Sequence, residues 1–166
     1  MPLRDRLPAL GLALTAALAT WSLACGRAPA AAPYTPPATR PGADGSDTYV
    51  DAPVVDRAAA AALDPVLGTP EAAVVKFLAS RARGDDRWRD AMAPGAGDER
   101  LQRALSEWSE WQVQRFQLRG RELAGPDRMR VTAWFEIAVE GDTDEGEDEF
   151  ELALADGVWR IERPPT

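Results

Sequence analysis

Hydrophobic residues in the C-terminal part of the chain first recur at helical spacing. Val74, Phe77 and Leu78 fall at the three- and four-residue intervals of one helix face. Thr69-Pro70-Glu71, just before them, supplies a cap, a residue suited to the first helical position and an acid at the positive end of the dipole. Gly84 is a typical helix end. The pattern predicts a helix from Pro70 to Gly84.

Two shorter helices are predicted next. Asp85-Asp86 offers a cap at either residue for a helix that carries Trp88 and Met92 and stops at Pro94-Gly95. Asp98 can cap a third helix. Its apolar stripe consists of Leu101, Leu105 and Trp108.

Beyond the third helix the apolar residues alternate with polar ones, which is typical of strands. Trp111 and Val113 share one parity, whereas Phe116 and Leu118 share the other, so a bulge is predicted near Gln114-Arg115. After a turn at 125–127, the clearest strand covers 131–139, and a polar loop is expected to follow it.

The last two strands are predicted at 150–154 and 158–162, joined by the two-residue turn Asp156-Gly157. This register sets two apolar pairs on one face: Leu154 opposite Trp159, and Leu152 opposite Ile161. On the other face it sets Glu151 opposite Glu162, a like-charge pair that must be exposed to solvent.

These elements predict an α+β domain over 66–163, with the N-terminal helices packed on a bent four-stranded antiparallel sheet. Its opening at 69–78, the Arg83-Gly84-Asp85-Asp86 segment, Trp88 and Met92 before Pro94, and the closing segment Gly157–Ile161 resemble NTF2-like domains, the superfamily of SnoaL and ketosteroid isomerase. The resemblance implies a cone whose concave side holds the helices and is either hollow or filled.

The N-terminus resembles a bacterial lipoprotein signal. A charged start and an apolar run from Leu7 to Leu23 lead to Ala24-Cys25-Gly26, and Cys25 is the single cysteine of the chain. The resemblance implies a signal peptide over 1–24 and a lipid on Cys25, with Gly26 favouring the outer membrane if the source is Gram-negative. The alternatives are an uncleaved membrane anchor and an ordinary cleaved signal.

Residues 25–65 are predicted to be the lipid-anchored cysteine and a disordered tether. The segment is rich in Pro, Ala and Gly and shows no hydrophobic period. Ala58 to Ala62 are five consecutive alanines, which fit either a short helix capped by Asp56 or low-complexity linker.

Composition excludes several functions. The 166 residues include no histidine and one cysteine, and the net charge is −8. Ser-His-Asp and Cys-His catalysis, histidine metal sites, an intramolecular disulfide and a Cys-rich zinc site are therefore all excluded. An acidic chain is also poorly suited to nucleic acid. No cofactor is predicted.

The candidate catalytic residue is Glu136, a carboxylate among apolar neighbours in the middle of a strand. Trp134 and Phe77 are expected beside it as pocket-lining residues; the alternative is that all three are ordinary surface or core residues. Ketosteroid isomerase needs a Tyr and a protonated Asp besides its Asp base. Here Tyr34 and Tyr49 both fall in the predicted tether, so no catalytic constellation is predicted.

Residues 140–151 hold eight carboxylates with no basic residue among them. Asp142, Asp144 and Glu147 are the candidates for weak binding of a divalent cation, although Gly146 falls one position too early for an EF-hand loop. The alternative is a solvated hairpin tip whose charges prevent aggregation through the sheet edge.

Together these patterns predict an exported lipoprotein, anchored at the cell envelope through Cys25. Its non-catalytic NTF2-like domain is expected to bind an envelope protein or a small ligand. The alternative is an enzyme or carrier that acts on an apolar small molecule in the cone, with Glu136 as base.

Overall fold

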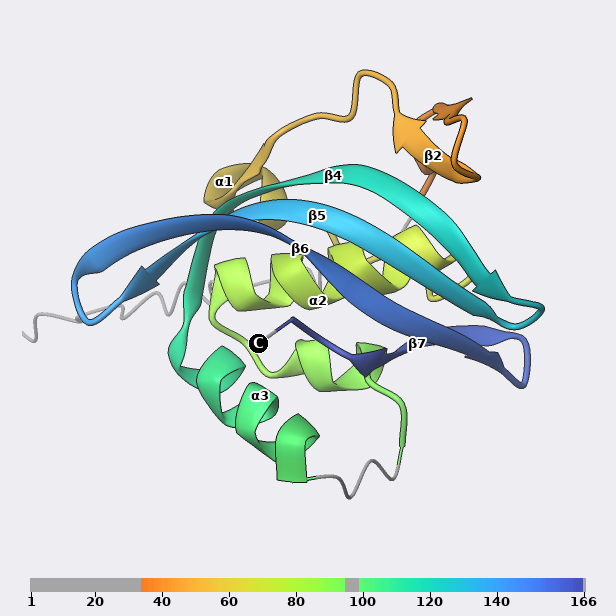
Figure 1. Cartoon of the computed structure of the whole chain (residues 1–166). Coiled ribbons are helices and arrows are strands. Elements are labelled where there is room, and N and C mark those ends of the chain that lie inside the picture. The colour runs from red at the N-terminus through yellow and green to blue at the C-terminus, as the bar shows by residue number, and fades with distance from the viewer. Residues whose placement is uncertain (1–33, 95–98, 166) are drawn as a thin grey trace, which may run out of the picture.

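The structure, a computed structural model, describes residues 34–94 and 99–165. These residues form an α+β fold in which a curved antiparallel sheet arches over one central helix, α2 (Figure 1). The elements of the described chain are β1 Thr39–Pro41, β2 Ser46–Tyr49, β3 Val55–Asp56, α1 Arg57–Ala60, α2 Pro70–Arg83, η1 Arg87–Ala91, α3 Glu99–Glu110, β4 Gln112–Gly125, β5 Arg128–Val139, β6 Asp142–Ala155 and β7 Val158–Arg163.

The sheet has seven strands within the described residues, in the order β1-β2-β4-β5-β6-β7, and β3 also pairs with β4. The predicted fold class is confirmed, but the predicted count of four strands is wrong. The four predicted strands correspond to β4–β7, and the other three come from the N-terminal side of α2.

Helix α2 begins and ends where the sequence predicts. The Thr69 hydroxyl accepts a hydrogen bond from the backbone N–H of Ala72 at 3.1 Å, Pro70 is the first helical residue, and Gly84 closes the last turn. The next predicted helix is the short 3-10 helix η1, in which the Asp85 carboxylate accepts from the Arg87 N–H at 3.1 Å. Asp98, the expected cap of α3, lies outside the described residues.

The core lies between α2 and the concave face of the sheet. The Phe77 ring of α2 makes edge contacts with Trp88, Trp108 and Phe150, with ring centroids 5.5, 4.9 and 5.6 Å apart. These four side chains are fully buried. They join η1, α3 and β6 to the central helix, and such edge contacts between aromatic rings stabilise the core beyond the area they bury.

Strand β4 bends through three register shifts against β5. The first lies between Val113 and Arg115, which confirms the predicted bulge, and further shifts fall between Leu118 and Gly120 and between Leu123 and Gly125. At Gly120 a Cβ atom would lie 2.8 Å from the Asp47 carbonyl oxygen. Glycine is therefore required where β2 crosses close to β4.

Strand β6 is longer than predicted, because the expected polar loop is mostly strand. The chain turns at Glu140-Gly141, and residues 142–153 pair with β5 without interruption. The segment has no apolar residue before Phe150, so no alternation is visible in its sequence. Its register is imposed by the neighbouring β5.

The last hairpin has the predicted turn, with positive φ angles of 52° at Asp156 and 75° at Gly157. Both apolar pairs are confirmed: Leu154 pairs with Trp159, and Leu152 pairs with Ile161. The predicted pairing of Glu151 with Glu162 is wrong. A register shift after Glu151 sets it opposite Arg163, with 3.4 Å between the carboxylate and the guanidinium, so a like-charge pair is replaced by an ion pair.

The N-terminal segment differs most from the prediction. Residues 34–65 lie in the predicted tether, yet β1 and β2 form a hairpin, β2 pairs with Gly120–Glu122 of β4, and Val55 pairs with Phe116. Pro41 is tolerated because β1 is the edge strand. The Asp56 carboxylate caps helix α1, so the polyalanine segment begins as a short helix and is not a low-complexity linker. The predicted start of the domain at residue 66 is therefore too late.

Candidate functional site

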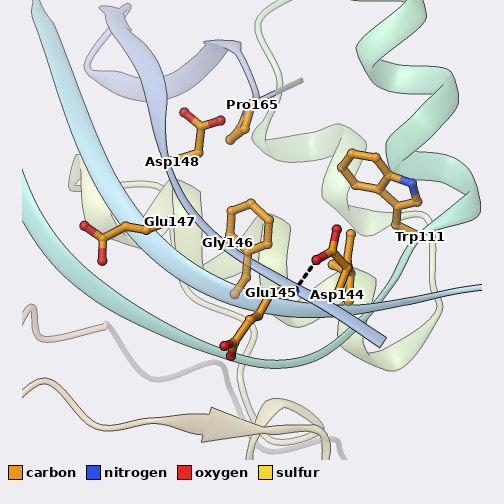
Figure 2. Close-up of a pocket in the computed structure, with 9 residues that line it drawn as sticks. Trp111, Asp144, Glu145, Gly146, Glu147, Asp148 and Pro165 are labelled. Carbon is orange, nitrogen blue, oxygen red and sulfur yellow. Dashed lines mark hydrogen bonds between the residues drawn. The ribbon is translucent and has the colours of Figure 1, made fainter. Parts of the chain in front are cut away.

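A pocket of about 160 Å³ opens at the concave face of the sheet, between the first half of β6 and the end of the chain (Figure 2). Its floor is apolar and comes from three different places in the sequence. The floor residues are Trp111, Phe135, Ile137 and Pro165. One rim is the segment 144–148 of β6, all of which is exposed.

Strand alternation sorts the acids of this rim. Phe150 and Leu152 of β6 are buried against the core, so the other even-numbered residues of β6 face the same concave side. Asp144 pairs with Ile137 and Asp148 with Ala133, both buried residues of β5. The two carboxylates therefore flank the apolar floor, whereas the side chains of Glu145 and Glu147 point away from it (Figure 2).

Gly146 lies between these two aspartates and opens the pocket. It pairs with Phe135, and a Cβ built on Gly146 would have no heavy atom within 4 Å. The backbone there has no positive φ. Its lack of a side chain thus leaves space above the Phe135 ring and meets no conformational need of the strand.

The other side of the pocket is closed by the end of the chain. Pro164 and Pro165 follow β7 and are buried, and the Trp108 indole N–H donates to the Pro165 carbonyl at 2.8 Å. Figure 1 shows this tail passing beneath the sheet toward α3. The tail and the aromatic cluster around Phe77 fill much of the concave side.

Arg81 of α2 holds the neighbouring wall in place. Its guanidinium donates to the carbonyl oxygens of Ser109, in the last turn of α3, at 3.0 Å and of Trp111 at 2.7 Å. Burial lowers the pKa of Arg81. Because the side chain is 7% exposed, these bonds satisfy part of a buried charge and fix the backbone that carries Trp111.

The predicted pocket residues are not brought together. Phe77 belongs to the aromatic core. Trp134 and Glu136 lie on the convex face, because the floor residues Phe135 and Ile137 have the opposite parity on β5. The Arg115 guanidinium donates to the Glu136 carboxylate and also lies 5.7 Å from the centroid of the Trp134 ring. Glu136 is therefore the partner of a surface arginine and does not face the pocket.

The candidate metal ligands do not converge either. Asp142 and Asp144 face the concave side, whereas Glu147 lies on the convex side, where its carboxylate is 3.4 Å from the Arg119 guanidinium. Within the described residues no three acidic side chains are arranged to hold an ion.

A second polar cluster ties the N-terminal segment to α2. Glu71 is 1% exposed; its Oε1 accepts from the Tyr49 hydroxyl at 2.8 Å and from Arg121 at 2.9 Å, and Arg121 also bonds Asp47 at 3.1 Å. Burial and the charge of Glu71 raise the pKa of Tyr49 far above its usual range, and the same two causes raise the pKa of Tyr34 to about 12. The assignment of both tyrosines to a tether is wrong, because they pack into the fold.

Sequence reasoning missed both the pocket and this cluster. The sole sequence signal for the hairpin beneath the cluster was Asp44-Gly45 before Thr48-Tyr49-Val50, a turn dipeptide followed by strand-forming residues. The pocket had no local signal, because its floor joins β5, the residue after α3 and the chain end, and its rim belongs to β6.

Comparison of the chain with family models, with curated proteins and with solved structures yields no match. No helix among the described residues is long and apolar enough to cross a membrane. Cys25 and the predicted signal peptide lie outside the described residues. The pocket and the strand that borders it are therefore the features of the described chain from which a function can be inferred.

Proposed function

We propose that this protein is an exported binding module, held at the cell envelope by a lipid on Cys25, whose NTF2-like domain recognises a partner without catalysing a reaction on it. The observation that carries the proposal is the pocket beside Gly146, with its apolar floor and its two flanking carboxylates. Such a site suits an apolar group that carries a neighbouring positive charge.

The size of the pocket favours this role over chemistry on a bulky apolar molecule. Sites that enclose drug-sized molecules usually measure about 300–1,000 Å³, whereas this pocket holds about 160 Å³. An amino-acid side chain or a single ring fits that volume. A larger partner would remain mostly outside the pocket and contact the rim.

The arrangement of charge supports a cationic partner. Glu147, Glu149 and Glu151 each have an arginine within 4 Å, but they lie on the convex side. On the concave side, the carboxylates of Asp144 and Asp148 each accept a hydrogen bond from the next backbone N–H, at 2.9 and 2.7 Å. These two carboxylates have no arginine or lysine within ion-pair distance in the described chain, so they are available to a positive charge at the pocket.

The NTF2-like assignment is supported by the arched antiparallel sheet over α2, as well as by the motifs at 69–78 and 157–161. The lipid anchor at the outer membrane is supported by the sequence around Cys25. The alternative of an enzyme with Glu136 as base gains no support, because Arg115 binds that carboxylate on the face opposite the pocket.

The test is an amide NMR titration of the domain with phenethylammonium, which joins a ring to a positive charge, and with 2-phenylethanol as its neutral counterpart. We expect the ammonium compound to shift the signals of Gly146 and Trp111 and the alcohol to do so at least about tenfold more weakly, since about 1.4 kcal/mol from two nearby carboxylates is sufficient for that ratio.

Gly146→Leu supplies the decisive variant. Its side chain should fill the pocket without strain and remove a strand glycine, so the protein should stay folded while binding is lost. Glu136→Gln is the matched control and should bind as the wild type does. Equal binding of the alcohol, or loss of binding in Glu136→Gln alone, would contradict the proposal.

A further inference from the structure

Strand β6 has an edge that no strand covers over most of its first half. Strand β7 pairs with residues 151–155 of β6, and between residues 142 and 150 the described chain supplies no strand on that side. Figure 1 shows β6 running past β7 along the margin of the sheet. In an antiparallel strand every second residue directs its N–H and C=O outward, so this edge offers main-chain acceptors and donors. Two of these donors, the Glu145 and Glu149 N–H groups, already bind the Asp144 and Asp148 carboxylates and would exchange them for the carbonyls of an added strand.

The edge is left open because of the two prolines after β7. Proline has no N–H and cannot extend a ladder, so β7 ends at Arg163. The chain then turns beneath the sheet, where the Trp108 indole N–H binds the Pro165 carbonyl. The position that β7 would occupy if it continued is therefore vacant in the described chain, and it passes directly beside the pocket.

We propose that the free edge of β6 binds an extended segment of a basic partner protein as an added strand, with an apolar side chain opposite Gly146 entering the pocket. This inference rests on the proposed function and names the partner of the same site. Strand addition is a common way to recognise an extended peptide: the main chain supplies affinity, and alternate side chains supply specificity.

The register of β6 specifies the partner sequence. A residue opposite Gly146 meets the apolar floor, and residues two positions away on either side face Asp144 and Asp148. The intervening residues face Glu145 and Glu147 on the convex side. Directly opposed side chains interact most strongly across strands. The preferred segment is therefore two basic residues, one apolar or aromatic residue, and two more basic residues.

Charge argues against a second copy of this chain as the occupant. If two β6 strands paired antiparallel about Gly146, Asp144 would oppose Asp148 and Glu145 would oppose Glu147, and like charges directly opposite each other destabilise a strand pair. If the acidic residues of β6 served only to prevent aggregation through the sheet edge, no pocket beside that edge would be required. The apolar floor next to this edge is what favours a partner.

The test uses the synthetic peptide acetyl-Thr-Lys-Lys-Phe-Lys-Lys-Thr-amide with two controls. The first control is a pair of N-methylated peptides. Each member of the pair carries methyl groups on one of the two alternating sets of backbone nitrogens, which keeps the charge and removes those main-chain donors. The other replaces Phe by Ser. We expect the parent peptide to bind and to slow hydrogen exchange of amides within 142–149, and one methylated set and the Ser peptide each to lose at least about tenfold in affinity.

Variants of the protein separate the two faces of β6. Asp144→Asn with Asp148→Asn should weaken the parent peptide more than Glu145→Gln with Glu149→Gln, which changes the same number of charges on the convex face. Equal binding of parent and both methylated peptides, no binding at all, or a concentration-dependent dimer that buries the edge would overturn the inference. If phenethylammonium binds while neither the parent peptide nor its controls slow the hydrogen exchange of amides within 142–149, strand addition is wrong and the pocket proposal stands.

Discussion

Tyr49→Phe tests whether the N-terminal segment is part of the fold. The substitution removes one hydroxyl from a buried side chain, and that hydroxyl donates to the Glu71 carboxylate at 2.8 Å. Glu71 would keep its bond to Arg121 at 2.9 Å but would lose the other of the two donors described above, in a site where water has little access. The ring itself would still pack in the same place.

The magnitude follows from the kind of bond that is lost. A hydrogen bond to a charged group contributes about 1.5–3 kcal/mol, and leaving a buried acceptor short of a donor accounts for most of that cost. Since Arg121 is about one third exposed and also binds Asp47, it can shift toward Glu71, so we expect the lower half of that range. A loss of about 2 kcal/mol corresponds to a decrease in Tm of roughly 6–10 °C for a domain of this size.

The assay is urea denaturation combined with amide hydrogen exchange, and Tyr34→Phe is the matched control. Tyr34 is half-buried, and its hydroxyl has no hydrogen bond within the described residues, so the same chemical change should cost well under 1 kcal/mol. Exchange in Ser46–Tyr49 should accelerate only in Tyr49→Phe. If the two variants were equally stable, or if β2 exchanged freely in the wild type, the buried cluster would not hold this segment.

Three further outcomes are expected. Tyr34 and Tyr49 are the two tyrosines of the chain, and both have a raised pKa in the folded protein, so the unfolded state releases their protons at lower pH. The free energy of unfolding should therefore fall as the pH rises above about 10. Tyrosinate absorbance of the folded protein near pH 10 would refute this. Gly157→Ala should cost about 1 kcal/mol in urea denaturation because of its φ of 75°, whereas Gly146→Ala should cost nothing. Cys25→Ser, expressed in a Gram-negative host, should lose the acyl mass and leave the membrane fraction; unchanged partitioning would exclude the lipid anchor.

The sequence predicted the elements whose burial pattern is local. Helix α2 combines a cap, an N-terminal proline and an apolar face, and β5 alternates cleanly, so both could be placed from neighbouring residues alone. The first half of β6 is acidic on both faces, and its strand structure comes from pairing with β5. Strand β1 was missed because it contains Pro41, a residue that is usually evidence against a strand but is tolerated at a sheet edge. Strand β2 was missed because its four residues carry no apolar alternation.

The candidate site was predicted less well for a related reason. The alternation of β5 correctly placed Phe135 and Trp134 on opposite faces of the strand. The cavity, however, was expected on the face of Trp134 and Glu136, whereas the pocket lies on the face of Phe135 and Ile137. Which face of a sheet is concave depends on where α2 packs, and that information is not contained in one strand. Pro165 and Trp111 reach the same pocket from two ends of the fold, so no sequence spacing could have joined them.

The N-terminal hairpin also sets how far the domain can travel. If Cys25 carries the proposed lipid, nine chain steps separate the membrane from Tyr34, and at ~3.3–3.6 Å per residue they span at most ~30 Å in any conformation. A disordered tether from Cys25 to residue 65 would span at most ~135 Å, which is more than fourfold farther. Because the effective concentration of a tethered group falls roughly as the −3/2 power of the tether length, folding of this segment raises the effective concentration of the domain near its own bilayer about tenfold. A partner embedded in the same membrane would thus be met far more often than one that diffuses freely or lies across the envelope.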